Sequence, residues 1–158
     1  MNRPTRTPRI SVRNLQRKVV IDTARLQDFA QRVLTILFAR PPNRRPELGR
    51  LAEISILLIS DRRMSSLHSR FLNKTGSTDV ITFDHGEIFI SVETARKHAR
   101  QFRTSTLREI QLYIIHALLH LNGFEDRSKT GAQKMEGAQQ KILAAATKTQ
   151  LRLIARCD

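Results

Sequence analysis

Two histidines four residues apart, His116 and His120, lie in an apolar stretch that ends at Gly123. On a helix, residues with this spacing lie on one face, so both imidazole rings can point to the same place. Gly123 permits a left-handed turn, and the carboxylates of Glu125 and Asp126 follow it. Zinc accepts imidazole nitrogen and carboxylate oxygen, and three protein ligands leave a position open for water, as in catalytic sites. We therefore predict a metal site here.

The alternative is the buried face of a helix that contains histidine without any metal. Two histidines four apart are weak evidence alone, because histidines on apolar helices are commonly hydrogen-bonded core or boundary residues. The glycine and the carboxylate after the pair favour the metal site. Ala117 follows the first histidine, where zinc proteases of the HExxH kind carry their glutamate base, and this argues against peptide hydrolysis.

The charge of the chain favours a polyanionic partner. Lysine and arginine number 28 against 14 acidic residues, which gives a net charge of +14. Basic side chains that neutralise phosphates release counterions and so favour nucleic acid, although charge can also serve solubility alone. With seven Phe, one Tyr and no Trp, we expect little base stacking and mainly backbone contacts. The candidate RNA-binding residues are Arg62, Arg63, Arg70 and Lys74.

Hydrophobic periodicity predicts an α+β fold that places the histidines on a central helix. We expect a small mixed β-sheet of about four strands packed with about five helices, with the metal site on that helix and the loop after it. The strands are predicted at 9–14, 53–60, 78–83 and 87–91, the last two as a hairpin. The helices are predicted at 22–40, 61–71, 92–102, 105–123 and 132–148.

The length of 158 residues predicts a single domain at 9–148, with a disordered basic tail at 1–8 and a C-terminal tail at 149–158. The one cysteine, Cys157, allows no internal disulfide and favours a reducing compartment. No apolar run approaches the ~20 residues that span a bilayer, so no membrane partner is expected. Because no acidic residue precedes Asp22, an organelle presequence is an alternative reading of the N-terminus.

Several blocks of the sequence together resemble one known family. HALLHLNGFED at 116–126 is similar to the signature H-G-x-L-H-L-x-G-Y-D-H of the YbeY family of metal-dependent endoribonucleases. TDVITF followed by EIFIS, the opening strand RISVRNLQ and the closing helix KMEGAQQKIL also resemble that family, in the same order. The likeness covers roughly residues 9 to 145, and this ordered agreement makes it more specific than a single motif.

The resemblance implies an endoribonuclease specific for single strands, which uses one zinc ion per chain. It implies a role in ribosomal RNA maturation and ribosome quality control in the bacterial cytoplasm, with the small ribosomal subunit as partner. His116 and His120 fall on the first two zinc ligands, and Asp126 falls on the third, where the family usually has histidine. Glu125 is the competing third ligand. No catalytic residue is implied beyond the water on the metal.

One departure from the family pattern puts activity in question. An alignment without gaps places Leu72 on a family arginine thought to hold the substrate phosphate, and His68 on an asparagine. Arg70 lies two residues earlier and is a candidate replacement. Two alternatives follow: a ribosome- or RNA-binding protein that keeps a structural metal with weakened catalysis, and a metallohydrolase of another substrate.

Overall fold

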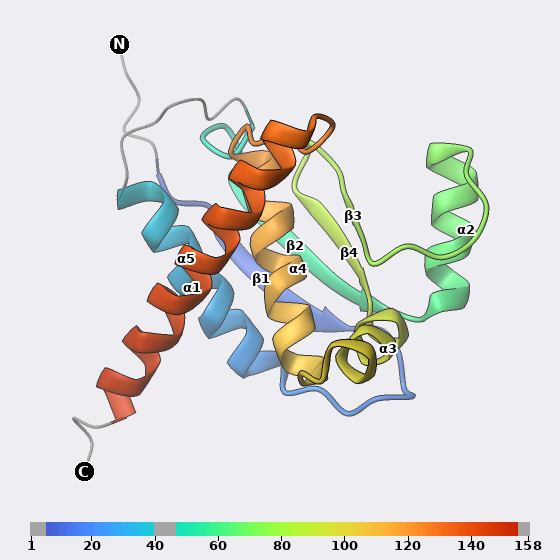
Figure 1. Cartoon of the computed structure of the whole chain (residues 1–158), viewed down its shortest axis with the longest axis horizontal. Helices are drawn as coiled ribbons and strands as arrows, with labels where there is room; N and C mark the ends of the chain where they lie inside the picture. Colours follow the sequence, from blue (N-terminus) through green and yellow to red (C-terminus); the bar gives the residue numbers. More distant parts are fainter. Residues whose placement is uncertain (1–5, 40–46, 155–158) are drawn as a thin grey trace.

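The computed structural model describes residues 6–39 and 47–154, and these form one four-stranded sheet with five helices (Figure 1). The predicted α+β fold is therefore confirmed. The elements in chain order are β1 (Arg9–Asn14), α1 (Thr23–Ala39), β2 (Glu53–Ile59), α2 (Asp61–Leu72), β3 (Val80–Thr82), β4 (Glu87–Ser91), α3 (Val92–Phe102), α4 (Thr106–Leu121) and α5 (Lys129–Ile154).

The sheet is mixed, with the strand order β1-β2-β4-β3. β2 pairs in parallel with β1 and β4, and β3 pairs antiparallel to β4 as the predicted hairpin. Ile54, Ile56 and Leu58 alternate along β2 and are fully or almost fully buried in the main core. Because strand side chains point alternately to the two faces, these three side chains lie on the same face of the sheet, and the helices cover that face.

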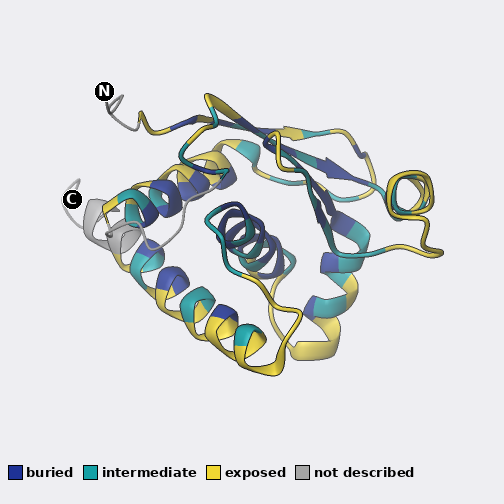
Figure 2. Cartoon of the chain, turned by 90° about the horizontal axis from the view of Figure 1, so that it is seen from above, coloured by how far each residue is buried: buried dark blue, intermediate teal, exposed yellow. Residues whose placement is uncertain are grey.

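Helix α4 is the centre of the helical layer. It packs against α1, α3, α5 and the sheet, and Figure 2 shows it end-on between these elements. Ile110, Ile114 and Leu118 of this helix have no exposed surface. A helix enclosed in this way is apolar around most of its circumference, which explains the continuous hydrophobic run in the sequence. The enclosure also fixes the direction in which the C-terminal end of α4 presents its polar side chains.

The ends of the chain differ in part from the prediction. The last helix is predicted at 132–148, but α5 (Lys129–Ile154) continues to Ile154, because no proline or glycine interrupts 149–154. Residues 155–158 lie outside the described part, as do residues 1–5 of the predicted N-terminal tail. Residues 40–46, which include the predicted end of the first helix, also lie outside it. Among the described helices, none is long and apolar enough to cross a bilayer.

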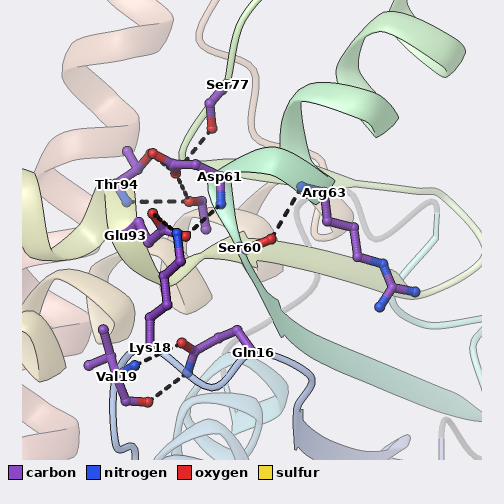
Figure 3. Close-up of polar contacts among 10 residues, drawn as sticks. Gln16, Lys18, Val19, Ser60, Asp61, Arg63, Ser77, Glu93 and Thr94 are labelled. Atoms are coloured by element: carbon purple, nitrogen blue, oxygen red, sulfur yellow. Dashed lines mark hydrogen bonds and ion pairs between the residues drawn. The ribbon is translucent and has the colours of Figure 1, made fainter.

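A partly buried carboxylate, that of Asp61, fixes α2 and the loop after it to the rest of the domain (Figure 3). Asp61 Oδ1 accepts hydrogen bonds from Ser77 Oγ at 3.2 Å, from Thr94 Oγ1 at 2.7 Å and from the Ser91 hydroxyl. Burial alone would raise the pKa of Asp61, but the three hydroxyl donors outweigh it and lower that pKa. The ionised carboxylate therefore connects α2, the 73–79 loop and the start of α3.

Candidate metal centre

His116 and His120 face each other near the C-terminal end of α4. Their Nε2 atoms are 3.0 Å apart, and the ring centroids are 4.5 Å apart with nearly perpendicular planes. The neighbouring side chains of Ala117, Leu118 and Leu119 are completely buried in the main core. The packing of these residues sets the rotation of the helix, so both imidazole rings emerge on the same side.

The turn after α4 brings the third predicted ligand to the same place. Gly123 has a φ of +93°, and its N–H donates to His120 O at 3.0 Å while Phe124 N–H donates to Leu119 O at 3.0 Å. This pair of bonds is the Schellman motif, which needs a left-handed residue after the helix. The chain then reverses, and Asp126 Oδ2 lies 3.5 Å from His116 Nε2 and 3.6 Å from His120 Nε2.

Hydrogen bonds on the far side of each ring fix the imidazole tautomers. His116 Nδ1 donates to Gln139 Oε1 at 2.7 Å, and His120 Nδ1 donates to the Phe124 carbonyl at 3.1 Å. A neutral imidazole has one N–H, so both Nε2 atoms present lone pairs to the space between the ligands. Gln139 comes from α5 and was missed by sequence reasoning, because a contact across 23 residues and two helices leaves no spacing signal.

Electrostatics favour the neutral form of the second histidine. Burial and the neighbouring His116 lower the pKa of His120, and together they outweigh Asp126 and the Phe124 carbonyl, which raise it. A lowered pKa keeps the His120 lone pair free of a proton at neutral pH. Metal ions bind the deprotonated imidazole, so this shift prepares the residue for coordination.

The three atoms form a donor set that fits a metal ion. Two Nε2 atoms and a carboxylate oxygen converge with separations of 3.0, 3.5 and 3.6 Å, an arrangement of three donor atoms that a bound cation would stabilise. Ligands roughly 2.1 Å from a tetrahedral zinc ion lie about 3.4 Å from one another. The side chains of His116, His120 and Asp126 are 26%, 32% and 40% exposed, so solvent reaches the group. Glu125 is exposed and, among the described residues, is not part of the group.

The predicted RNA-binding residues lie on α2 and the loop after it, outside the metal group. Arg62, Arg63, Arg70 and Lys74 are all exposed. At ~1.5 Å per residue, Arg62 and Arg70 are separated by about 12 Å along the helix, so the four do not form one cluster. In Figure 1 the C-terminal end of α2 lies at the same upper end of the molecule as the α4–α5 loop. The last turn of α2, which includes Arg70, therefore lies at that end.

The two positions that depart from the family pattern have ordinary local surroundings. His68 Nδ1 lies 3.0 Å from the Gly76 carbonyl and donates to it, which closes the loop after α2. Leu72 is the last residue of α2 and is exposed. Among the described residues, the candidate metal group includes neither side chain.

Gly131 controls the position of the loop that carries Asp126, and its replacement by alanine should weaken metal binding. A Cβ at Gly131 would lie 2.4 Å from the Glu125 carbonyl oxygen, so the loop backbone must move away from α5. We expect zinc affinity to fall by about tenfold, the size seen when groups supporting a ligand are lost. Competition with a chromophoric chelator measures it.

Gly137→Ala is the matched control for this change. Gly137 lies in the same helix, and a Cβ there meets no atom within 4 Å. We expect unchanged zinc affinity and a gain of about 0.5–1 kcal/mol in unfolding free energy, because alanine is the better helix former. Equal zinc affinity in the Gly131→Ala protein and the unchanged protein would show that this close approach does not position Asp126.

Comparisons with known proteins agree with this architecture. The sequence model of the family described as "Endoribonuclease YbeY" matches residues 11–147. The chain is 36% identical over 102 residues to "Endoribonuclease YbeY" of Phocaeicola vulgatus, covering 60% of this chain and 74% of that protein. It is 28% identical over 148 residues to that of Acidothermus cellulolyticus, covering 80% and 85%. A solution structure from Thermotoga maritima shares the fold, with a TM-score of 0.59, 22% identity and coverage of 89% and 93%.

Proposed function

The chain belongs to the endoribonuclease YbeY family, and from this premise we propose that it is a metal-dependent endoribonuclease acting on single-stranded RNA. Its proposed role is ribosomal RNA processing and ribosome quality control in the bacterial cytoplasm, with the small ribosomal subunit as partner. The observation that carries the proposal is the convergence of two imidazole lone pairs and one carboxylate oxygen in a solvent-accessible group at the end of α4. The net charge of +14 supports a phosphate-rich substrate.

The proposed cofactor is one zinc ion per chain, held by His116, His120 and Asp126. Two nitrogen donors and one oxygen donor suit zinc, and three protein ligands are the number found in catalytic zinc sites. When bound, the ion would supply Lewis-acid chemistry, which activates water and polarises a phosphate ester. The carboxylate of Asp126 reduces the positive charge of the site relative to three neutral histidines.

The residues of the chain contribute orientation and substrate binding. The Gln139 and Phe124 oxygens hold protons on the two Nδ1 atoms and so keep both Nε2 atoms available. Arg70 in the last turn of α2 and Lys74 in the loop after it are exposed and can bind backbone phosphates of the substrate. Phosphate contacts of this kind position RNA without reading its sequence.

A second candidate function is an RNA- or ribosome-binding protein that keeps the metal but cleaves slowly. The observation that favours it is the exposed Leu72, at the position that the resemblance aligns with a phosphate-binding arginine. The same feature permits a metallohydrolase of another substrate. These alternatives share the metal group and differ in whether single-stranded RNA is cleaved.

Cleavage of a labelled single-stranded RNA, with the same strand in a duplex as a comparison, tests the proposal. We expect the zinc-loaded protein to cut the single strand, a chelator to stop the reaction, and added zinc to restore it, because the solvent-accessible group would hold a single exchangeable ion. Binding of RNA without cleavage under all three conditions would favour the second candidate. If the protein neither binds nor cleaves the RNA, the result would favour the hydrolase of another substrate.

A further inference from the structure

An exposed group of aromatic rings lies between α2 and the β3–β4 turn. The Phe71 and Phe83 ring centroids are 5.6 Å apart in an edge-to-face arrangement, and Phe83 and the His85 ring are stacked with centroids 5.5 Å apart. Phe71 is 57% exposed, and the His85 side chain is 65% exposed. We call Phe71, Phe83 and His85 the aromatic platform.

Two contacts hold the rings of the platform in place, one made by Phe83 and one by His85. Phe83 contacts Phe89 edge-to-face at 5.9 Å, and Phe89 is buried in a second core cluster with Ile59, Met64 and Ile81. The His85 ring is held by its Nε2, which lies 2.8 Å from Glu87 Oε2. Rings fixed in this way lose little conformational entropy when another planar group stacks on them, which favours binding.

Cationic residues flank Phe71 of the platform in the sequence. Arg70 directly precedes Phe71, and Lys74 follows three residues later; both are exposed. Within 6–39 and 47–154, neither side chain forms an ion pair with a carboxylate. Exposed rings beside free cations are the combination by which proteins bind single-stranded nucleic acid: the rings stack on bases, and the cations contact phosphates. A purely apolar partner would leave these charges without a counterpart.

Contacts between elements link the platform to the helix that carries the candidate metal group. Helix α4 contacts β3, and α2 contacts β4, so the hairpin lies between the two helices. In Figure 1 the β3–β4 turn, the α4–α5 loop and the C-terminal end of α2 lie at the same upper end of the molecule. Ile88 and Ile90 of β4 lie in the main core with α4, whereas Phe89 between them lies in the second core cluster under the platform. The platform and α4 therefore lie on opposite faces of the sheet, and a strand with one phosphate at the metal group would pass around the β3–β4 turn to reach the platform.

We propose that Phe71 and His85, supported by Phe83, stack on bases of single-stranded RNA beside the scissile phosphate. This inference rests on the proposed function, and it would explain why the protein prefers single-stranded RNA to a duplex. The bases of a duplex are stacked on one another and cannot lie on protein rings, whereas unpaired bases are free to do so. The small number of aromatic residues in the sequence thus matters less than their clustering at one place.

Binding of a fluorescent single-stranded RNA, measured at constant moderate salt without metal, tests the platform separately from cleavage. We expect Phe71→Ala and Phe71→Leu each to weaken binding by about tenfold, because each variant removes one stack between a base and an aromatic ring. Phe71→Tyr should retain affinity, since it keeps the ring. Duplex binding should change little in all three.

Phe102→Ala is the matched control, because Phe102 is a similarly exposed phenylalanine, 59% against 57%, at the end of α3. It should bind single-stranded RNA like the unchanged protein, and melting curves should show that all variants are folded. Unchanged affinity in Phe71→Ala, or full affinity in Phe71→Leu, would overturn the platform even if the protein cleaves RNA. A change of oligomeric state on Phe71→Ala in sedimentation would instead assign the face to a second copy of the chain. If cleavage fails but the binding pattern holds, only the nuclease proposal fails.

Discussion

Replacing His120 by alanine should remove metal binding and RNA cleavage while leaving the protein folded. The change deletes one of three converging donor atoms and leaves His116 and Asp126, which cannot hold zinc as a chelate of three ligands. Loss of groups that only support a ligand costs about 10- to 100-fold in metal affinity, so loss of a ligand should cost more than about 100-fold. Cleavage should fall at least as far, because the Lewis acid is lost with the ion.

The measurement is zinc content after dialysis, with single-stranded RNA cleavage and a melting curve on the same preparation. His68→Ala is the control, since His68 also donates from Nδ1 to a backbone carbonyl but is outside the metal group. That variant should keep its zinc and its activity. Full zinc content in the His120→Ala protein would mean that the converging atoms are not the metal site. Lost zinc with retained cleavage would point to a contaminating nuclease.

The metal group was predictable because its determinants are local. His116, His120, Gly123 and Asp126 lie within eleven residues, and helical spacing followed by a left-handed turn brings their side chains together. Gln139 was not predictable in the same way. Its contact with His116 depends on how α5 packs against α4, and neither amphipathic pattern specifies that rotation.

In the fold, too, features set by neighbouring residues could be predicted from the sequence, and features set by distant contacts could not. Alternation and turn residues predicted the strands and the β3–β4 hairpin, but nothing local specified that β4 would lie between β2 and β3. The aromatic platform depends on that order, because it combines the end of α2 with the hairpin turn. The hydroxyl donors around Asp61 likewise come from separate segments, and in the sequence they are ordinary serine and threonine residues.

Substitutions at Asp126 should decide what the exchange of histidine for aspartate does to the site. Asp126→Ala should reduce zinc affinity more than about 100-fold, like the loss of either histidine, because Oδ2 is the third converging atom. Asp126→His should keep the ion, since imidazole is an equally good zinc ligand. With no carboxylate, that site is more positive by one charge, and water next to a more positive ion loses its proton more readily. The pH at which cleavage reaches half its maximum should therefore shift downward.

Glu125→Ala separates the two neighbouring carboxylates. Glu125 is exposed and outside the group, so its loss should change neither zinc content nor the pH profile. If Glu125→Ala loses zinc while Asp126→Ala keeps it, the ligand is Glu125 and the loop adopts a different conformation around the ion. If Asp126→His keeps zinc without any shift in pH profile, the carboxylate does not set the acidity of the site. The half-maximal pH thus reports charge at the metal, and zinc content reports ligand identity, so the two roles of Asp126 are measured independently.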